Sequence, residues 1–483
     1  MAESLLSVGI DVGTTTTQLV VSRITVENRA SGFCVPEMDI TNREILYESE
    51  VAFTPLVGEN LVDGGKIAEF VEEEYRKAGI KPTEVDTGAV IVTGETSRKE
   101  NAAAVLQSLA GLAGEFVVAT AGPDLESILA AKGAGAVAYS QRTGKNVLHM
   151  DIGGGTSNLC YIRDGEIAAT GCLNVGGRLV KVEDGRISYV STVVESLWAA
   201  GASPRPTGRM EVGEGAEVRK LEALADVLVQ GLEMAAGLRE KTPLWDALWT
   251  QECGEYGERI ATPVCGLARN DVDFRQGRME VGDRWVVSFS GGVADCIRED
   301  FDSFAFGDMG PILGRAIRKS RLCRGEYMLG EHTIRATVIG AGCHSAQLSG
   351  STVFCRDVAL PLKNLTVAAV PEDEQTDAGS IARRLAAADS GKAVLALPGY
   401  AGAGYAQVAQ LADAVLEGFG DREILVCIEQ DLAKALGQML FLRSGKPCLC
   451  IDRVRLPAGS YLDVGVPVGP CFPVVVKTLI LNG

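Results

Sequence analysis

The apolar and polar positions along the chain predict a strand–turn–strand unit that occurs twice. Residues 8–21, VGIDVGTTTTQLVV, run from an apolar segment through an acid and a Gly-Thr turn into a second apolar segment. Because this turn is too short for a parallel crossover, the pattern predicts an antiparallel hairpin. Residues 149–162, HMDIGGGTSNLCYI, have the same order of parts. The echo indicates two halves of related topology.

Helical spacing of apolar residues predicts two amphipathic helices. Residues 67–79 form one that stops at a glycine, and residues 216–240 form the other. In the second helix the apolar residues at this spacing are Leu221, Leu224, Ala225, Leu228 and Leu232.

Two further segments are rich in Gly and Ala. Residues 115–140 predict a strand and then a small-residue helix with Pro123 in its first turn. Residues 335–354 predict a strand, a glycine turn and another small-residue helix. Close helix crossing needs such small side chains, so we expect the two helices to pack tightly.

From about residue 356 strand and helix patterns alternate. The predicted order is strand, helix, strand, helix, strand for AVLALPG, YAQVAQLADAVLEGF, EILVCIEQ, DLAKALGQMLFL and PCLCIDRV, with PVVVKTLIL as a last strand. Alternation of this kind predicts the α/β class. Periodicity leaves open whether this region completes the second half or forms an added α/β unit.

Length and composition narrow the class. A chain of 483 residues exceeds one ordinary core, so two or more domains are expected. The net charge of 46 − 63 = −17 repels polyanions, which argues against nucleic acid as a partner. No stretch approaches about 18 uninterrupted apolar residues, and no signal peptide is recognisable, so we expect a cytoplasmic protein without a membrane partner.

Cysteine and histidine usage argues against a soft-metal site. The 13 cysteines include no CxxC pair, which predicts reduced and mostly buried thiols. The three histidines are too separated for a His-rich metal site.

The two Asp-Gly hairpins carry the chemistry. Glycines let the backbone approach a ligand closely, and successive N–H groups in such a turn bind phosphate oxygens. An acid at the strand end is placed to hold Mg²⁺, usually through water. Two such hairpins facing each other across a cleft would grip a triphosphate from both sides. A P-loop, a dinucleotide-binding fold and a GxSxG hydrolase find no matching pattern.

The order of motifs resembles the actin, sugar kinase and heat-shock ATPase superfamily. Its phosphate 1, connect 1, phosphate 2, adenosine and connect 2 motifs match GIDVGTTTT, GPDLESILAAKGAGAVAYS, DIGGGTSN, SFSGGVAD and VIGAGCHSAQLSG, which span residues 9–350. The resemblance implies a two-lobed actin-like ATPase of the α/β class, with ribonuclease H-like lobes, inserted subdomains and a C-terminal α/β extension. It also implies ATP and Mg²⁺ as cofactors.

Carried onto this chain, the resemblance implies a set of site residues. Asp11 and Asp151 match the acids that position Mg²⁺ and its waters. The residues that match the ATP-binding loops and hinge motifs are Gly13, Thr14, Thr15, Gly153, Gly154, Gly155, Thr156, Gly291, Gly292, Asp295, Gly340 and Gly342. Asp295 either begins the following helix or reaches the ribose.

The general base is the least determined part of the expected site. Heat-shock ATPases place a Glu before the connect 1 proline, whereas Gly122 precedes Pro123 here. Asp124 or Glu126 is the candidate replacement, and for either the alternative is a first-turn helix acid. In-line attack of water on the γ-phosphate needs positioning and charge neutralisation more than covalent help.

Within the superfamily the chain resembles the ethanolamine ammonia-lyase reactivases. The segments that suggest this are VTGETSRKENAAAVL, GPDLESILAAKGAGA, DIGGGTSNLCYIRDGEI, CLNVGGRLV, TPVCGLARND and SGGVADCI. The resemblance implies an ATP-dependent, chaperone-like factor that releases damaged cobalamin from the inactivated lyase, so that adenosylcobalamin can rebind. Association with a bacterial microcompartment is also implied, and a homodimer is left open.

The expected domains are 1–140 as a first lobe with an inserted subdomain, 141–355 as a second lobe with a helical insert near 195–280, and 356–483 as the C-terminal α/β region. The alternative function is a small-molecule kinase of the same superfamily, which needs a carboxylate base facing a substrate hydroxyl. Two further alternatives are a filament or scaffold protein and an iron–sulfur activase of radical dehydratases. The chain lacks the clear cysteine ligand set that such an activase needs.

Overall fold

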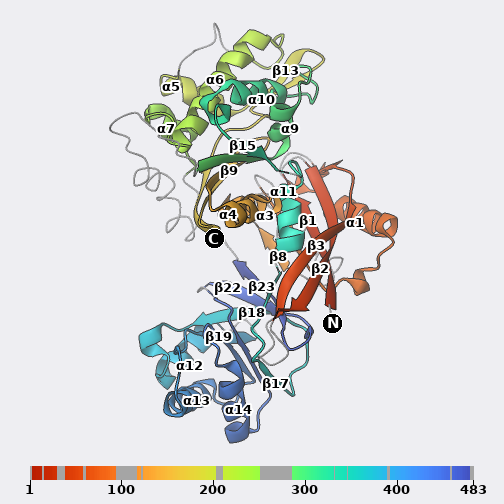
Figure 1. Cartoon of the computed structure of the whole chain (residues 1–483). Helices are drawn as coiled ribbons and strands as arrows, with labels where there is room; N and C mark the ends of the chain where they lie inside the picture. Colours follow the sequence, from red (N-terminus) through yellow and green to blue (C-terminus); the bar gives the residue numbers. More distant parts are fainter. Residues whose placement is uncertain are drawn as a thin grey trace.

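A computed structural model describes residues 3–13, 16–29, 38–57, 61–93, 117–120, 123–202, 210–250, 285–330, 332–344, 346–388, 392–456 and 459–478. Thr14 and Thr15 of the first phosphate motif lie outside these ranges. Figure 1 shows three large sheets: one in red and orange, one in yellow and green, and one in blue.

The first two sheets share one topology. The first has the order β3-β2-β1-β7-β8, with β4 on β2, and the second has the order β11-β10-β9-β14-β15. In each, the three earliest strands are antiparallel and the last two are added in parallel. The strands are β1 (Glu3–Val12), β2 (Thr16–Asn28), β3 (Met38–Glu48), β4 (Ala52–Phe53), β7 (Thr87–Val92), β8 (Val117–Thr120), β9 (Asn146–Ile152), β10 (Ser157–Arg163), β11 (Glu166–Leu173), β14 (Trp285–Ser290) and β15 (Tyr327–Leu329). This order confirms the α/β fold class with two ribonuclease H-like lobes.

One face of the first sheet is covered by α1 (Gly64–Ala78), at the right of Figure 1. Its Ile67, Val71 and Tyr75 pack with Val8 and the other apolar residues of that face. The helix ends where Gly79 adopts φ 70° and donates to the carbonyls of Tyr75 and Arg76. The predicted helix with a glycine stop is confirmed.

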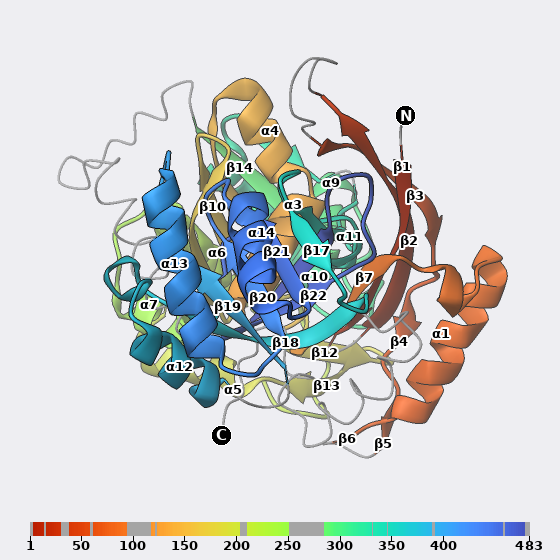
Figure 2. The same cartoon turned by 90° about the horizontal axis from the view of Figure 1, so that it is seen from below.

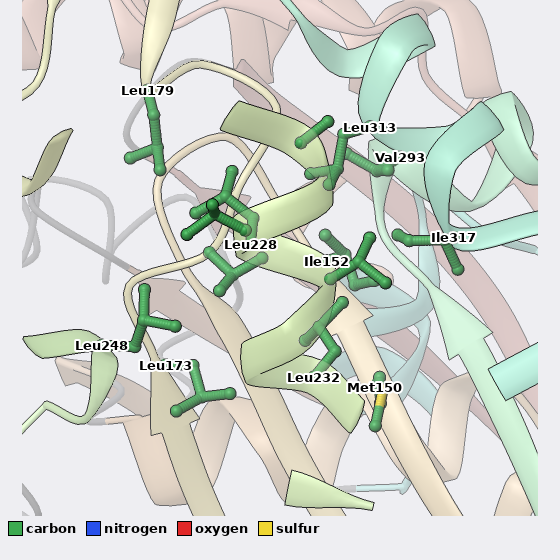
Figure 3. Close-up of a cluster of buried hydrophobic side chains, with 14 of the residues drawn as sticks. Met150, Ile152, Leu173, Leu179, Leu228, Leu232, Leu248, Val293, Leu313 and Ile317 are labelled. Carbon is green, nitrogen blue, oxygen red and sulfur yellow. The ribbon is translucent and has the colours of Figure 1, made fainter. Parts of the chain in front are cut away.

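The second sheet has a larger core, formed with α5 (Thr192–Ala199), α6 (Val218–Ala235), α7 (Pro243–Leu248), α9 (Gly292–Arg298) and α10 (Gly310–Lys319). Figure 3 shows Met150 and Ile152 of β9 in this cluster, with Leu228 and Leu232 of the predicted amphipathic helix. Because strand side chains alternate, Asp151 points to the opposite face of β9.

Two small-residue helices, α3 (Pro123–Gly133) and α11 (Ala336–His344), lie between the lobes in Figure 1. α3 and the following α4 (Ala136–Thr143) pack on β9, β10 and β11, although they precede that sheet in the chain. α11 follows the second sheet but packs on β1, β2 and β7 of the first. Each helix is therefore attached to the sheet of the other half.

The α3–α11 crossing depends on glycine. A Cβ on Gly133 would lie 1.9 Å from the carbonyl oxygen of Ala336, and one on Gly340 would lie 2.0 Å from that of Leu129. Two small-residue helices in tight contact are thus present as predicted, but the second lies earlier in residues 335–354 than expected.

The strand predicted at the start of 335–354 was wrong. Ala336–His344 is helical, and Ala346–Leu348 forms the short strand β16 where a helix was expected. Thr337, Val338 and Ile339 favour strands by propensity. Tertiary packing overrides that preference, because the segment lies against α3 and β1 in a space that admits a helix with glycine at its contacts.

The C-terminal region forms a sheet of its own. Its order is β16-β23-β22-β18-β19-β20-β21-β17, and α12 (Ala378–Ala387), α13 (Tyr405–Phe419) and α14 (Ala433–Ser444) pack on one face, as Figure 2 shows. The strands are β17 (Phe354–Arg356), β18 (Leu362–Ala369), β19 (Ala393–Leu397), β20 (Ile424–Ile428), β21 (Cys448–Asp452), β22 (Ser460–Val464) and β23 (Pro473–Thr478). The predicted alternation is confirmed.

This C-terminal sheet is joined to the first lobe and the hinge by a shared apolar cluster. Val475 of β23 and the nearby Val468 pack with Leu5 and Ile24 of the first sheet and Ala341 of α11. Two short hairpins lie outside the three large sheets, β5 (Leu56–Val57) with β6 (Leu61–Val62) and β12 (Val180–Glu183) with β13 (Arg186–Val190). The ten cysteines in the described residues carry free thiols, and eight of them are buried.

We predict that Gly340→Ala destabilises the protein by about 1–3 kcal/mol, because the added methyl forces the crossing helices apart. Gly65→Ala is the matched control: Gly65 is exposed on α1, and a Cβ there would lie 3.5 Å from Asp63 Oδ1, its nearest contact. This substitution should leave stability unchanged or slightly raised. Urea unfolding followed by circular dichroism measures both. Equal midpoints for the two variants would contradict the glycine requirement at the crossing.

Candidate nucleotide site

The two Asp-Gly hairpins share one backbone hydrogen bond. In the first, the Gly13 N–H donates to the Thr16 carbonyl at 2.9 Å, and in the second the Gly153 N–H donates to the Thr156 carbonyl, also at 2.9 Å. In the first hairpin, the Thr54 hydroxyl also donates to the Gly13 carbonyl at 2.8 Å. Each turn thus joins the acid-bearing strand to its antiparallel neighbour with the same bond.

Asp11 and Asp151 come from different sheets but interact. Asp11 accepts a hydrogen bond from the Thr93 hydroxyl at 2.9 Å. Burial raises the pKa of Asp11 to about 7; the Thr93 bond opposes this shift, and the charge of Asp151 adds to it. Burial also raises the pKa of Asp151 to about 6, against hydrogen bonds from Ser290 and Thr337. The structure therefore brings the two sequence-predicted acids together, both desolvated.

A buried relay holds Asp151 from behind. The Ser290 hydroxyl donates to the Asp151 carboxylate. Ser290 therefore accepts from His149, whose Nε2 lies 2.9 Å from its hydroxyl, and His149 Nδ1 lies 3.0 Å from the Ser288 hydroxyl. Burial lowers the pKa of His149 to about 3, so the ring is neutral. Since Nε2 carries its one proton, Nδ1 accepts from Ser288.

Sequence reasoning missed this relay. The sequence motifs place Ser288 and Ser290 only in the adenosine motif and give His149 no role beyond that of a disfavoured metal ligand. The signal was available: His149 and Asp151 alternate on one predicted strand, as Ser288 and Ser290 do on another. What the sequence did not contain was the parallel register that pairs His149 with Ser288 and Asp151 with Ser290.

The second phosphate loop is supported by backbone on one side and open on the other. The Gly177 N–H donates to the Gly153 carbonyl at 3.0 Å, and the Arg178 N–H donates to that of Gly154 at 2.6 Å. A Cβ on Gly154 would lie 3.2 Å from the Arg178 side chain, whereas one on exposed Gly155 would meet nothing within 4 Å. The open side leaves room for an anion against the loop.

The support behind this loop is itself fixed by an ion pair. Arg178 Nε lies 3.0 Å from Asp308 Oδ2, and the other oxygen of Asp308 accepts the Gly310 N–H at 2.8 Å. Neither Arg178 nor Asp308 was among the sequence-predicted residues. They position the backbone behind Gly153 and Gly154, and no short sequence motif predicts this role.

The adenosine motif packs against the strand that carries Asp151. Gly291 has φ 84°, and a Cβ there would lie 2.3 Å from the Ile152 carbonyl oxygen, so only glycine fits. Its N–H donates to the Thr333 carbonyl at 2.8 Å. Gly292 begins α9, and Asp295 in the first turn of that helix accepts from the Thr333 hydroxyl at 2.5 Å. Asp295 therefore fixes the 332–335 segment.

The connect 2 glycines lie within the hinge. Gly340 contacts α3, as described above, and a Cβ on Gly342 would lie 2.9 Å from the backbone nitrogen of Gly9 on β1. The Ser7 hydroxyl donates to the Gly342 carbonyl. Both glycines permit close packing of α11, on α3 and on the first sheet respectively.

The two candidate bases occupy the first turn of α3 in different environments. Asp124 is 4% exposed, and its Oδ1 accepts from the Thr170 hydroxyl at 2.5 Å. Its Oδ2 is buried without a hydrogen-bond partner among the described residues, and burial raises the pKa of the carboxyl. Glu126 is only partly buried.

The donor set fits a hydrated hard cation. Within the described ranges no three His, Cys, Asp or Glu side chains gather as a metal cluster. The carboxylates that the structure brings together at the site are Asp11 and Asp151. Magnesium commonly binds proteins through one or two carboxylates, keeping several waters and contacting substrate phosphates. Buried acceptors that lack donors in the described structure, Asp124 Oδ2 and Gln18 Oε1, suit the protons of such waters.

Comparison with known proteins assigns the family. The family model described as "Ethanolamine utilisation protein EutA" matches residues 3–482. The chain belongs to the EutA family. Two relatives, from Salmonella typhimurium and Escherichia coli, are each 36% identical to this EutA-family chain, with 98% of both chains covered, and each is named "Ethanolamine ammonia-lyase reactivase EutA". The suspected resemblance is confirmed.

Solved structures that resemble this EutA-family chain are more distant. An Aquifex aeolicus member of the Ppx/GppA family is 14% identical with a TM-score of 0.38, over 70% of this chain and 97% of that one. Component A of the Acidaminococcus fermentans (R)-2-hydroxyglutaryl-CoA dehydratase is 14% identical with a TM-score of 0.31, over 70% and 97%. The ethanolamine utilization protein EutJ from Carboxydothermus hydrogenoformans is 17% identical with a TM-score of 0.28, over 70% and 88%.

Among the helices that the structure describes in this EutA-family chain, none combines the length and the apolar character that crossing a bilayer requires.

We predict that Ser290→Ala destabilises this EutA-family chain by about 1–3 kcal/mol, because the His149 N–H loses its buried acceptor and Asp151 loses a donor. Ser196→Ala is the control, since Ser196 makes only an exposed bond of 3.4 Å to the Thr192 carbonyl within α5. Urea unfolding compares the two variants. A Ser290→Ala midpoint equal to that of Ser196→Ala would show that the relay contributes nothing to the fold.

Proposed function

We propose that this chain is an ATP-dependent reactivase that releases damaged cobalamin from inactivated ethanolamine ammonia-lyase, so that adenosylcobalamin can rebind. The observation that carries the proposal is the pair Asp11 and Asp151, presented by two lobes of one topology that meet at the α3–α11 hinge. Full-length relatives named as reactivases of this lyase support the choice of client.

In this proposal the cleft binds ATP with magnesium. Backbone N–H groups of the Gly13 and Gly153 turns, with the neighbouring Thr14, Thr15, Gly154, Gly155 and Thr156, would hold the phosphates. Gly291 and Gly292 would lie against the adenosine. Asp11 and Asp151 would hold the waters of Mg²⁺, which when bound neutralises the phosphate charge that develops during transfer. The buried, mutually repelling carboxylates support a cation between them.

We assign the water-activating role to Asp124 rather than Glu126. Thr170 fixes one carboxylate oxygen of Asp124 and leaves the other buried and unpartnered in the described structure. Burial raises the pKa of this carboxyl above its usual value, which brings it closer to that of a general base. Asp124 belongs to the hinge helix that packs on the Asp151 sheet, so its position would follow lobe closure.

We infer a division of labour between three domains, expected at 1–140, 141–355 and 356–483, although the packing of the helices crosses these bounds: α3 lies on the second sheet and α11 on the first. Because α3 packs on the second sheet and α11 on the first, closing the cleft would slide one helix over the other at the glycine contacts. The C-terminal sheet shares an apolar cluster with the first lobe and would move with it. A shift of this kind requires ATP to bind the closed state more tightly than the open state. The movement of the lobes would then open the cobalamin site of the partner enzyme.

The kinase alternative is less well supported. It requires a carboxylate base that faces a substrate hydroxyl, and no contact of the described residues separates such a base from one that activates water. The relatives' name favours the reactivase. A cytoplasmic location with microcompartment association, and a homodimer, stay predictions.

We predict that Asp124→Asn binds magnesium-ATP with nearly the wild-type KM but hydrolyses it about 10²–10⁴-fold more slowly, because the amide cannot accept the water proton. Glu126→Gln is the control on the same helix turn and should keep kcat close to wild type. Steady-state phosphate release measures both. Loss of kcat in Glu126→Gln, with Asp124→Asn unaffected, would reverse the assignment.

We predict that the wild-type chain restores deamination to hydroxocobalamin-inhibited ethanolamine ammonia-lyase when ATP, Mg²⁺ and adenosylcobalamin are added, and that Asp151→Asn does not. Asp164→Asn is the control, because Asp164 is exposed in a hairpin turn at φ 51°, which Asn tolerates. If the wild-type chain hydrolyses ATP but restores no deamination, the assignment of the lyase as its partner is wrong. A metabolite kinase is then favoured, and phosphate transfer to a metabolite would detect it.

A further inference from the structure

Gln18 is a buried polar residue beside the site that neither the motifs nor the family match assign. It lies directly opposite Asp11 in the antiparallel β1–β2 ladder, so the two side chains share the face of the sheet that packs on α11. Its side chain is 3% exposed. A buried glutamine next to a carboxylate needs partners for both ends of its amide.

The orientation of the Gln18 amide follows from its one observed partner. Gln18 Nε2 donates to the Ile334 carbonyl at 3.3 Å. Because that carbonyl can only accept, the NH₂ group must face it, and Oε1 must face elsewhere. Oε1 is buried and has no donor among the described residues. Gln18 Oε1, on a residue paired with Asp11, is therefore a buried acceptor without a donor in the described structure.

A donor placed between Gln18 Oε1 and an ionised Asp11 has to serve two acceptors. The Asp11 carboxylate, when ionised, only accepts hydrogen bonds, and Gln18 Oε1 only accepts. A phosphate oxygen without a proton would meet two acceptors and be repelled. A water molecule carries two protons, and a water bound to Mg²⁺ donates more strongly than bulk water, because the ion polarises it.

We propose that Gln18 is a positioning residue of the magnesium–nucleotide site, whose Oε1 accepts a hydrogen bond from a water of the metal's hydration shell. The proposal rests on the nucleotide cleft of the proposed function. It adds a direct link from this water to the second lobe, because Gln18 bonds to Ile334.

The segment at the other end of that link holds the adenosine motif. Thr333, next to Ile334, accepts from the Gly291 N–H at 2.8 Å and donates to Asp295 at 2.5 Å. The following Arg335 donates to the Ser49 carbonyl of the first lobe at 2.7 Å. The Gln18 side chain therefore links the Asp11 side of the cleft to the backbone that contacts the adenosine motif.

The test compares Gln18→Met, which keeps the length but removes both amide functions, with Gln18→Glu, which keeps an acceptor oxygen and loses the donor to Ile334. Gln141→Met is the matched control: Gln141 also donates to a backbone carbonyl, that of Gly165 at 3.2 Å, but from α4. Binding of a non-hydrolysable ATP analogue is measured calorimetrically over a range of Mg²⁺ concentrations, with Mn²⁺ binding followed by electron paramagnetic resonance.

We expect Gln18→Met to need about tenfold more Mg²⁺ for half-saturation, as for other residues that orient a metal's ligands. Gln18→Glu and Gln141→Met should need no more Mg²⁺ than wild type. Unchanged Mg²⁺ dependence in Gln18→Met would overturn the proposed positioning role of Gln18. An equal loss of affinity for the ATP analogue with and without metal would also overturn it. If Gln18→Met does not fold, a tenfold rise in Gln18→Glu decides against the proposal. A wild type indifferent to Mg²⁺ would remove the proposed function as well.

Discussion

The close crossing of α3 and α11 is the constraint on which the two-lobed structure depends. At Gly133 and Gly340 the backbones approach so closely that no side chain fits between them. Each helix is anchored on the sheet that the other half of the chain builds, α3 through Asp124 and Thr170 and α11 through Ser7. A displacement at the crossing is therefore a displacement of one sheet relative to the other. Packed interfaces of this kind shift between discrete arrangements rather than deform continuously.

The electrostatics of the cleft follow from the same arrangement. Asp11 and Asp151 lie on the inner faces of their sheets, opposite the apolar faces that pack on α1 and α6. Burial then raises both pKa values, and hydroxyl donors oppose the shift, Thr93 at Asp11 and Ser290 with Thr337 at Asp151. A cation shared between the acids would relieve their repulsion and favour closure.

The second lobe has the more elaborate support. Behind Asp151 a serine, a neutral histidine and a second serine fix the carboxylate, and the ion pair of Arg178 with Asp308 fixes the phosphate turn. The first lobe has a shorter arrangement around Asp11, with Thr93 at 2.9 Å. The C-terminal sheet packs on this first lobe through an apolar cluster that includes Val475. The lobe with less local support around its acid is thus the one enlarged by an added sheet.

Local patterns in the sequence were sufficient for the elements near the site. Alternation and turn chemistry predict both hairpins, Gly79 ends α1 as expected, and the repeated Asp-Gly order indicates two lobes of one topology. Only tertiary structure decided the rest. The 336–344 segment is a helix despite its β-branched residues, and its glycines let that helix pack closely on α3 and β1. The partners of Asp151, and the different surroundings of Asp124 and Glu126, depend on strand register and burial, which bring together residues that lie far apart in the chain.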